Sequence, residues 1–175
     1  MKKINVITLG CSKNTVDSEH LMARLAAAGY EVVFDSDRTD AKTVVINTCG
    51  FIESAKTEAI ENILEACSYK QQNPELKVIV TGCLAERYRS QIEEEIPEVD
   101  AVVGCASNKA IDTIVARLFH GENHLESYGA KKDFPLGGKR VIGTPAHYAY
   151  LKIAEGCNNR CHYCAIPGIR GPLHS

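Results

Sequence analysis

Short apolar runs alternate along the chain with segments in which apolar residues recur every three or four positions. Five runs rich in Val and Ile predict buried strands, at residues 4–9, 31–34, 43–48, 77–81 and 101–103. The segments between them predict helices at residues 16–28, 54–71, 85–96 and 108–119. This alternation favours an α/β fold with a five-stranded, parallel, doubly wound sheet of flavodoxin-like type.

The regular pattern breaks after residue 121. Residues 122–145 contain four glycines and two prolines, and Lys131, Lys132, Lys139 and Arg140 make them locally basic, which is typical of a linker. Residues 148–153 predict a new strand that begins a second unit at residues 146–175. About 30 residues are too few to bury a core of their own. We therefore expect a domain at 1–121, a linker at 122–145 and the start of a further domain, in an N-terminal piece of a longer protein.

Charge and hydropathy narrow the classes of function. The chain has 20 Lys and Arg against 22 Asp and Glu, so its net charge of −2 gives no electrostatic case for binding nucleic acid or an anionic membrane. It has neither a signal peptide nor an apolar run long enough to span a bilayer. The sequence thus predicts a cytoplasmic protein without a membrane partner. In that setting, eight cysteines indicate metal, cluster or redox chemistry rather than disulfides.

The most specific motif is a cysteine triplet at Cys157, Cys161 and Cys164, directly after the predicted strand. Three thiolates within eight residues can bind three irons of a 4Fe–4S cluster and leave the fourth iron open. An open iron can chelate the amine and carboxylate of S-adenosylmethionine, whose reductive cleavage gives a 5′-deoxyadenosyl radical. The spacing therefore predicts a radical-generating cluster with S-adenosylmethionine as its cosubstrate.

Two other interpretations of the triplet explain it less well. Zinc requires a fourth ligand, and His162 is poorly placed to supply one because it adjoins Cys161. A redox pair at Cys161 and Cys164 leaves Cys157 without a role. Tyr163 is a candidate for packing against the nucleoside, with an ordinary core aromatic as the alternative.

A second set of cysteines is spread along the chain. Cys11, Cys49 and Cys83 each come directly after a predicted strand, and the carboxyl ends of parallel strands form one crevice. Three thiolates there could bind a second cluster, although buried cysteines are also ordinary small core residues. Cys105 also follows a strand end, and it is either a fourth ligand or a bystander. Cys67 lies inside a predicted helix, where an ordinary packing role explains it. Lys13 and Asn14, next to Cys11, could bind cluster sulfides or substrate, or lie in a solvated loop.

These motifs resemble those of the radical S-adenosylmethionine methylthiotransferases. The resemblance covers essentially the whole chain and rests on residues 8–14, 17–19, 46–52, 81–84 and 148–157. Gly10-Cys11-Ser12-Lys13-Asn14, Cys49-Gly50-Phe51-Ile52 and the segment from Cys164 to Pro167 with Arg170-Gly171 look most like the branch that acts on a small-subunit ribosomal protein. The branches that act on transfer RNA usually carry a different triplet beside the first cysteine.

The resemblance implies a function for each cysteine set. Cys11, Cys49 and Cys83 would hold an auxiliary 4Fe–4S cluster, and Cys157, Cys161 and Cys164 the radical cluster at the start of a radical-enzyme barrel. The implied reaction is methylthiolation of an aspartate β-carbon in the ribosomal protein, with an electron donor as a further partner. The piece alone is expected to be inactive. Methylthiolation of an adenosine in transfer RNA, or an electron-transfer or cluster-carrier module, are the alternatives.

Overall fold

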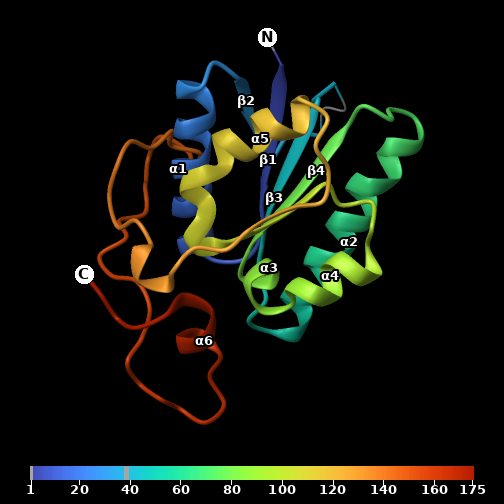
Figure 1. Cartoon of the computed structure of the whole chain (residues 1–175). Helices are drawn as coiled ribbons and strands as arrows, with labels where there is room; N and C mark the ends of the chain where they lie inside the picture. Colours follow the sequence, from blue (N-terminus) through green and yellow to red (C-terminus); the bar gives the residue numbers. More distant parts are fainter. Residues whose placement is uncertain (1, 38–39) are drawn as a thin grey trace.

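Six parallel strands form the centre of the computed structural model, which describes residues 2–37 and 40–175 (Figure 1). The strands are β1 (Lys3–Thr8), β2 (Glu31–Phe34), β3 (Thr43–Thr48), β4 (Lys77–Gly82), β5 (Ala101–Gly104) and β6 (Leu125–Ser127). Their order is β2-β1-β3-β4-β5-β6. The predicted doubly wound, flavodoxin-like sheet is confirmed, with its change of direction between β1 and β3.

The sixth strand differs from the prediction of five. β6 pairs in parallel with β5, in the register Ala101↔Leu125 and Val103↔Ser127, inside the segment predicted as a linker. Its three residues are too few to show an alternating pattern, and of these only Leu125 is buried. The sheet therefore extends beyond residue 121. The start of the second unit at residue 146 stays a prediction.

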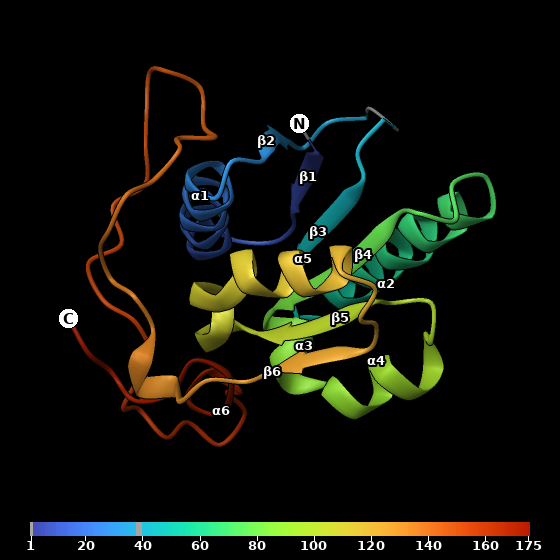
Figure 2. The same cartoon turned by 45° about the horizontal axis from the view of Figure 1, so that its top comes forward.

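Helices cover both faces of the sheet (Figure 2). One face carries α1 (Ser12–Ala27) and α5 (Ile111–Phe119), and the other carries α2 (Glu53–Ser68), α3 (Cys83–Arg87) and α4 (Arg89–Glu95). The single helix predicted at 85–96 is two helices, because the backbone leaves the helical region at Tyr88, with φ −123° and ψ 35°. Two 3-10 helices, η1 (Tyr69–Gln71) and η2 (Cys105–Ala110), precede β4 and α5.

Alternate residues of the strands supply two hydrophobic cores. Ile4 and Val6 of β1 face α1 and α5, whereas Val44 and Ile46 of β3 face α2. All four are buried, since successive side chains point to opposite faces and both faces are covered. This explains why the strands read as continuous apolar runs.

Replacing Ile63 with alanine is expected to lower the free energy of unfolding by about 2–5 kcal/mol, because the cavity it leaves adds to the lost burial. Ile63 lies on α2 with no exposed surface, in the core against β3 and β4. Its neighbour Leu64 is 51% exposed, and Leu64→Ala should cost at most about 0.5 kcal/mol. Urea unfolding curves of the two variants would test this. Equal losses would show that the face of α2 is assigned wrongly.

The segment after β6 runs along the edge of the domain and ends beside the carboxyl ends of the strands (Figure 1). It contains the 3-10 helix η3 (Lys131–Asp133), the helix α6 (Ile166–Arg170) and an isolated antiparallel bridge between Glu155 and His174. The strand predicted at residues 148–153 is wrong for this structure, because no neighbouring strand pairs with this described segment. Leu151 and Ile153 are 83% and 76% exposed.

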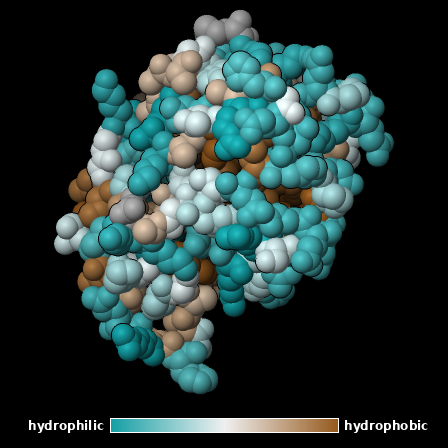
Figure 3. Space-filling model, viewed as in Figure 1, coloured by the Kyte–Doolittle hydropathy of each residue, from teal (hydrophilic) through white to brown (hydrophobic). Residues whose placement is uncertain are grey.

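The segment after β6 leaves apolar side chains on the surface. Apolar side chains form a brown area along the left edge of Figure 3, where the segment after β6 runs in Figure 1. Across residues 2–37 and 40–175, none of the helices has both the length and the apolar character needed to cross a membrane.

Candidate functional site

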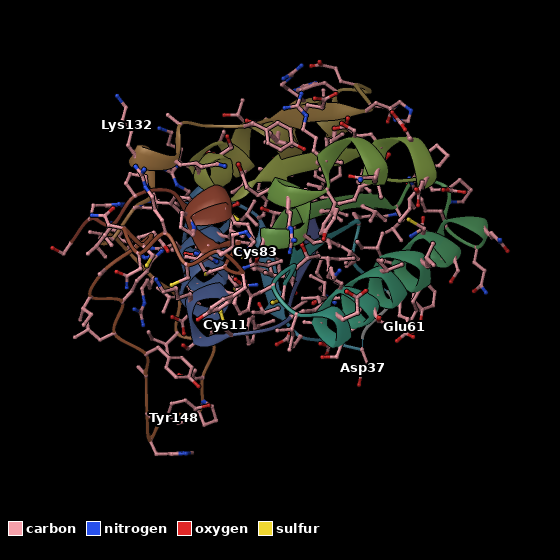
Figure 4. The ribbon with its side chains drawn as sticks, turned by 90° about the horizontal axis from the view of Figure 1, so that it is seen from below. Cys11, Asp37, Glu61, Cys83, Lys132 and Tyr148 are labelled. Atoms are coloured by element: carbon pink, nitrogen blue, oxygen red, sulfur yellow. The ribbon has the colours of Figure 1, made fainter. Side chains whose placement is uncertain are left out.

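Cys11, Cys49 and Cys83 line one cavity of about 770 Å³ at the carboxyl ends of the strands. Cys11 lies between β1 and α1, Cys49 follows β3, and Cys83 is the first residue of α3, directly after β4. Figure 4 shows Cys11 and Cys83 at the same end of the domain, close to α6. From α6, Ile166 and Arg170 complete the wall. The structure thus brings together three cysteines that lie 38 and 34 residues apart in the sequence.

Two glycines allow the strand ends to approach each other at the cavity. Gly10 has φ +95°, and a Cβ there would lie 2.5 Å from the Cβ of Cys49. Gly82 has φ +96°, and a Cβ there would lie 2.3 Å from the carbonyl oxygen of Thr48. Residues with a side chain rarely adopt this backbone conformation and would also clash here. The glycine before Cys11 and the glycine before Cys83 are therefore requirements of the site's geometry.

The thiols around the cavity differ in acidity. A hydrogen bond from the Cys105 thiol, followed by the nearby Arg170 guanidinium, lowers the pKa of Cys83 against the opposing effect of burial. The same hydrogen bond, together with burial, raises the pKa of Cys105 well above its usual range. Burial also raises the pKa of Cys49. Cys83 is thus better prepared than Cys49 or Cys105 to bind iron as a thiolate.

Cys105 stands behind Cys83 rather than beside the cavity. It is 1% exposed and packs with Cys83, Phe134 and Ile169 in a small cluster. Within the described part of the chain, the cavity wall includes Cys83 but not Cys105. Of the two predicted roles, the bystander fits this position. Cys67 is buried in α2 among core residues, as its helix position predicts.

Arg170 connects α6 to the cysteine cavity through a buried set of polar contacts. Its Nη1 donates to Asp17 at 2.7 Å and to Glu155 at 3.0 Å. Its Nη2 donates to Asn14 at 2.7 Å and approaches the Sγ of Cys83 to 3.5 Å. The guanidinium is 2% exposed. One side chain therefore contacts the start of α1, the segment before the cysteine triplet and a cavity cysteine at once.

Two lysines extend these contacts. Lys152 donates to Asp17 at 2.8 Å and pairs with Glu155 at 2.5 Å, and it is almost completely buried. Lys13 donates to Glu155 at 3.1 Å from a more exposed position. The cations Arg170 and Lys152, through coulombic and hydrogen-bonding contacts, lower the pKa of Glu155 to about 2 although burial acts in the opposite direction. Glu155 is therefore an ionised partner of both cations.

The two asparagines near the cavity support its backbone. Asn14 has no exposed surface and donates to the carbonyl oxygens of Leu9 and Thr48. Asn47 donates to the carbonyl oxygen of Asn14 and to Ser18, so it braces the neighbouring turn. Asn14 and Lys13 are thus occupied by protein groups, which argues against the solvated loop that was one prediction for them.

The triplet Cys157, Cys161 and Cys164 lies on one surface loop. Cys161 is exposed and the other two are partly exposed. The backbone N–H of Asn159 points to the Sγ of Cys157 at 3.4 Å, and the N–H of Cys164 donates to the carbonyl oxygen of Cys161. Tyr163 is 90% exposed, so the core-aromatic alternative is wrong.

The residues present fit iron–sulfur clusters better than a single metal ion. Among the described residues, no group of three Cys, His, Asp or Glu converges in the way that one ion requires. In a 4Fe–4S cluster each thiolate binds a different iron, so the ligands surround a larger body. Three thiols around a cavity with closely approaching glycines suit such a body. Sequence patterns missed Asp17, Lys152, Glu155 and Arg170 as a site, although Asp17 and Arg170 lie within the motifs of the resemblance.

Comparison with known proteins agrees with these motifs. The model of the uncharacterized protein family UPF0004 matches residues 3–104. The chain is 46% identical, over 98% of its length, to the ribosomal protein uS12 methylthiotransferase RimO of Caldicellulosiruptor saccharolyticus. It is also 46% identical, over 97% of its length, to the protein of the same name from Bacteroides fragilis.

Both of these relatives are longer than this chain. It spans 39% of the first of these relatives and 36% of the second. Both relatives are named as members of the ribosomal branch, so the predicted resemblance is confirmed. The chain therefore belongs to the family UPF0004, and it is a relative of the ribosomal protein uS12 methylthiotransferases.

Proposed function

We propose that the intact protein transfers a methylthio group to the β-carbon of an aspartate in ribosomal protein uS12, by radical S-adenosylmethionine chemistry. The observation that carries the proposal is the meeting of Cys11, Cys49 and Cys83 at one cavity that α6 closes, in a chain whose relatives bear that enzyme's name. The protein would act in the cytoplasm, together with a reductant that supplies electrons.

Each cysteine set has its own part in this proposal. Cys11, Cys49 and Cys83 would hold the auxiliary cluster, and Cys157, Cys161 and Cys164 the radical cluster. When bound, such clusters supply open iron sites and electrons for S-adenosylmethionine cleavage. The protein's own residues shape the surroundings of each cluster. Phe51, Ile52 and Ile166 give the cavity an apolar wall. Tyr163, exposed beside Cys164, is available to pack against the nucleoside.

The charges near the cavity favour a protein substrate over transfer RNA. The cations at its wall, Lys13 and Arg170, are paired with the carboxylates Glu155 and Asp17 rather than free to contact phosphates. A nucleic-acid site depends on cations that neutralise phosphates. With a net charge of −2, the chain as a whole offers no compensating excess.

Deleting the gene is expected to lower the mass of intact uS12 by about 46 Da in mass spectra. This is the difference between the SCH₃ group and the hydrogen that it replaces. The intact gene should restore the mass, whereas a copy with Cys157, Cys161 and Cys164 replaced by alanine should not, because no radical cluster would form. Nucleoside analysis of transfer RNA from the same strains is the control. An unchanged uS12 mass with a lost transfer-RNA modification would contradict the proposal.

A further inference from the structure

Arg170 occupies a position that the cysteine motifs alone do not explain. It follows Cys164 by six residues, and its guanidinium is buried between the first domain and Glu155, which lies two residues before Cys157. Among the described residues, its hydrogen bonds go to four groups: two carboxylates, the Asn14 amide oxygen and the Cys83 sulfur. A planar fork with five N–H groups is the side chain suited to bridging several acceptors at fixed angles.

We propose that Arg170 is a positioning residue that fixes the two cysteine sets relative to each other and raises the reduction potential of the cluster held by Cys11, Cys49 and Cys83. This inference rests on the proposed function, since it requires that cluster. The contact that carries it is the 3.5 Å approach of Nη2 to the Sγ of Cys83, at the wall of the cavity.

The positioning role follows from what the guanidinium connects. Asp17 and Asn14 belong to α1, which begins directly after Cys11. Glu155 lies two residues before Cys157, and Arg170 itself ends α6. The backbone carbonyl of Gly171, the next residue, accepts from the N–H of Cys157 at 3.1 Å. The segment that carries the triplet is thus held to the first domain at both of its ends.

The electrostatic role follows from the charge balance of the same contacts. Arg170 and Lys152 are balanced by Asp17 and Glu155, so the buried ion pairs carry no net charge by themselves. Reduction adds one electron to a cluster and breaks no bond, so the reduced state is more negative. A cation and an N–H donor at a ligand sulfur stabilise that state, because net charge and hydrogen bonds to sulfur set the potential. Removing Arg170 should make reduction harder.

The test measures the reduction potential of the auxiliary cluster alone. The intact protein with Cys157, Cys161 and Cys164 replaced by alanine is reconstituted with iron and sulfide. It is then titrated with dithionite and followed by electron paramagnetic resonance. Arg170→Gln is expected to bind the same iron and to show a more negative midpoint. Arg170→Lys keeps the charge without the fork, so its midpoint should stay close to the parent, whereas hydrogen exchange over residues 155–171 becomes faster.

Arg140→Gln is the matched control. Arg140 also pairs with a buried carboxylate of α1, Glu19 at 3.0 Å, but it is not in the cavity wall. The midpoint potential of the Arg140→Gln variant should equal that of the parent. An iron-loaded Arg170→Gln protein with an unchanged midpoint would overturn the inference and leave the proposed function standing. Iron loss in Arg170→Gln would also overturn it, because the inference expects this variant to bind the same iron as the parent. A parent without iron would overturn the proposed function as well.

Discussion

Replacing Cys11, Cys49 and Cys83 together with alanine is expected to lower the iron content of the reconstituted intact protein from about eight to about four atoms per chain. These thiols line one cavity, so their loss removes every cysteine of its wall. The complementary replacement of Cys157, Cys161 and Cys164 should remove the remaining iron, about four atoms per chain. Iron and sulfide assays with absorption spectra would measure both.

Two cysteines serve as controls for that experiment. Cys67 is buried in α2, and burial raises its pKa to about 11, so it remains a thiol at neutral pH. Cys67→Ala should leave the iron content unchanged. Cys105→Ala should also retain the iron, because Cys105 is not in the cavity wall among the residues described. Full iron binding by the triple variant would exclude the first cluster, and loss of iron in Cys105→Ala would make Cys105 a ligand.

Replacing Asp17 with asparagine is expected to destabilise the docking of the segment 152–171 by about 3–5 kcal/mol. Asp17 accepts hydrogen bonds from both Lys152 and Arg170, and these cations are about 2% exposed. Without Asp17, two buried positive charges share Glu155 as their remaining carboxylate in these contacts. Hydrogen exchange over residues 152–171 should accelerate strongly, whereas β3 and β4 should exchange as before.

An exposed ion pair of similar length provides the contrast. Arg117 and Glu122 approach to 2.6 Å, but both side chains are almost half exposed. Glu122→Gln should therefore change hydrogen exchange very little, because water screens the charges and solvates them when they are unpaired. If Asp17→Asn changed exchange no more than Glu122→Gln does, the buried contacts would not hold the segment.

Most of the fold follows from the sequence because its signals are local. Val44 and Ile46 belong to an apolar run of three residues that faces both sides of the sheet, and such runs identify interior parallel strands. The short strand β6 has no such run, because edge strands bury little. The break at Tyr88 lies in the backbone conformation of a single residue, which a periodic pattern does not record.

The candidate site also has residues that the sequence predicts and residues that it does not. Cys157, Cys161 and Cys164 are visible from spacing, and Cys11, Cys49 and Cys83 from their places after strands. Arg170 and its partners are not visible, because Asp17 and Arg170 are 153 positions apart. Ion pairs over such separations leave no periodic trace. A single charged residue in a short helix has many possible partners until the fold is known.

The separation of Asp17 from Arg170 also sets an order of events during synthesis. At about 5–20 residues per second, a ribosome adds the 87 residues from Cys83, the last cysteine of the first cavity, to Arg170 in about 4–17 s. Every cysteine of the first cavity emerges before α6 does. The nascent chain therefore holds this cavity without its last wall for many seconds, which is a period in which iron and sulfide can enter. Synthesis of the cysteine cavity and its closure by α6 are in this way separated in time by the length of the chain itself.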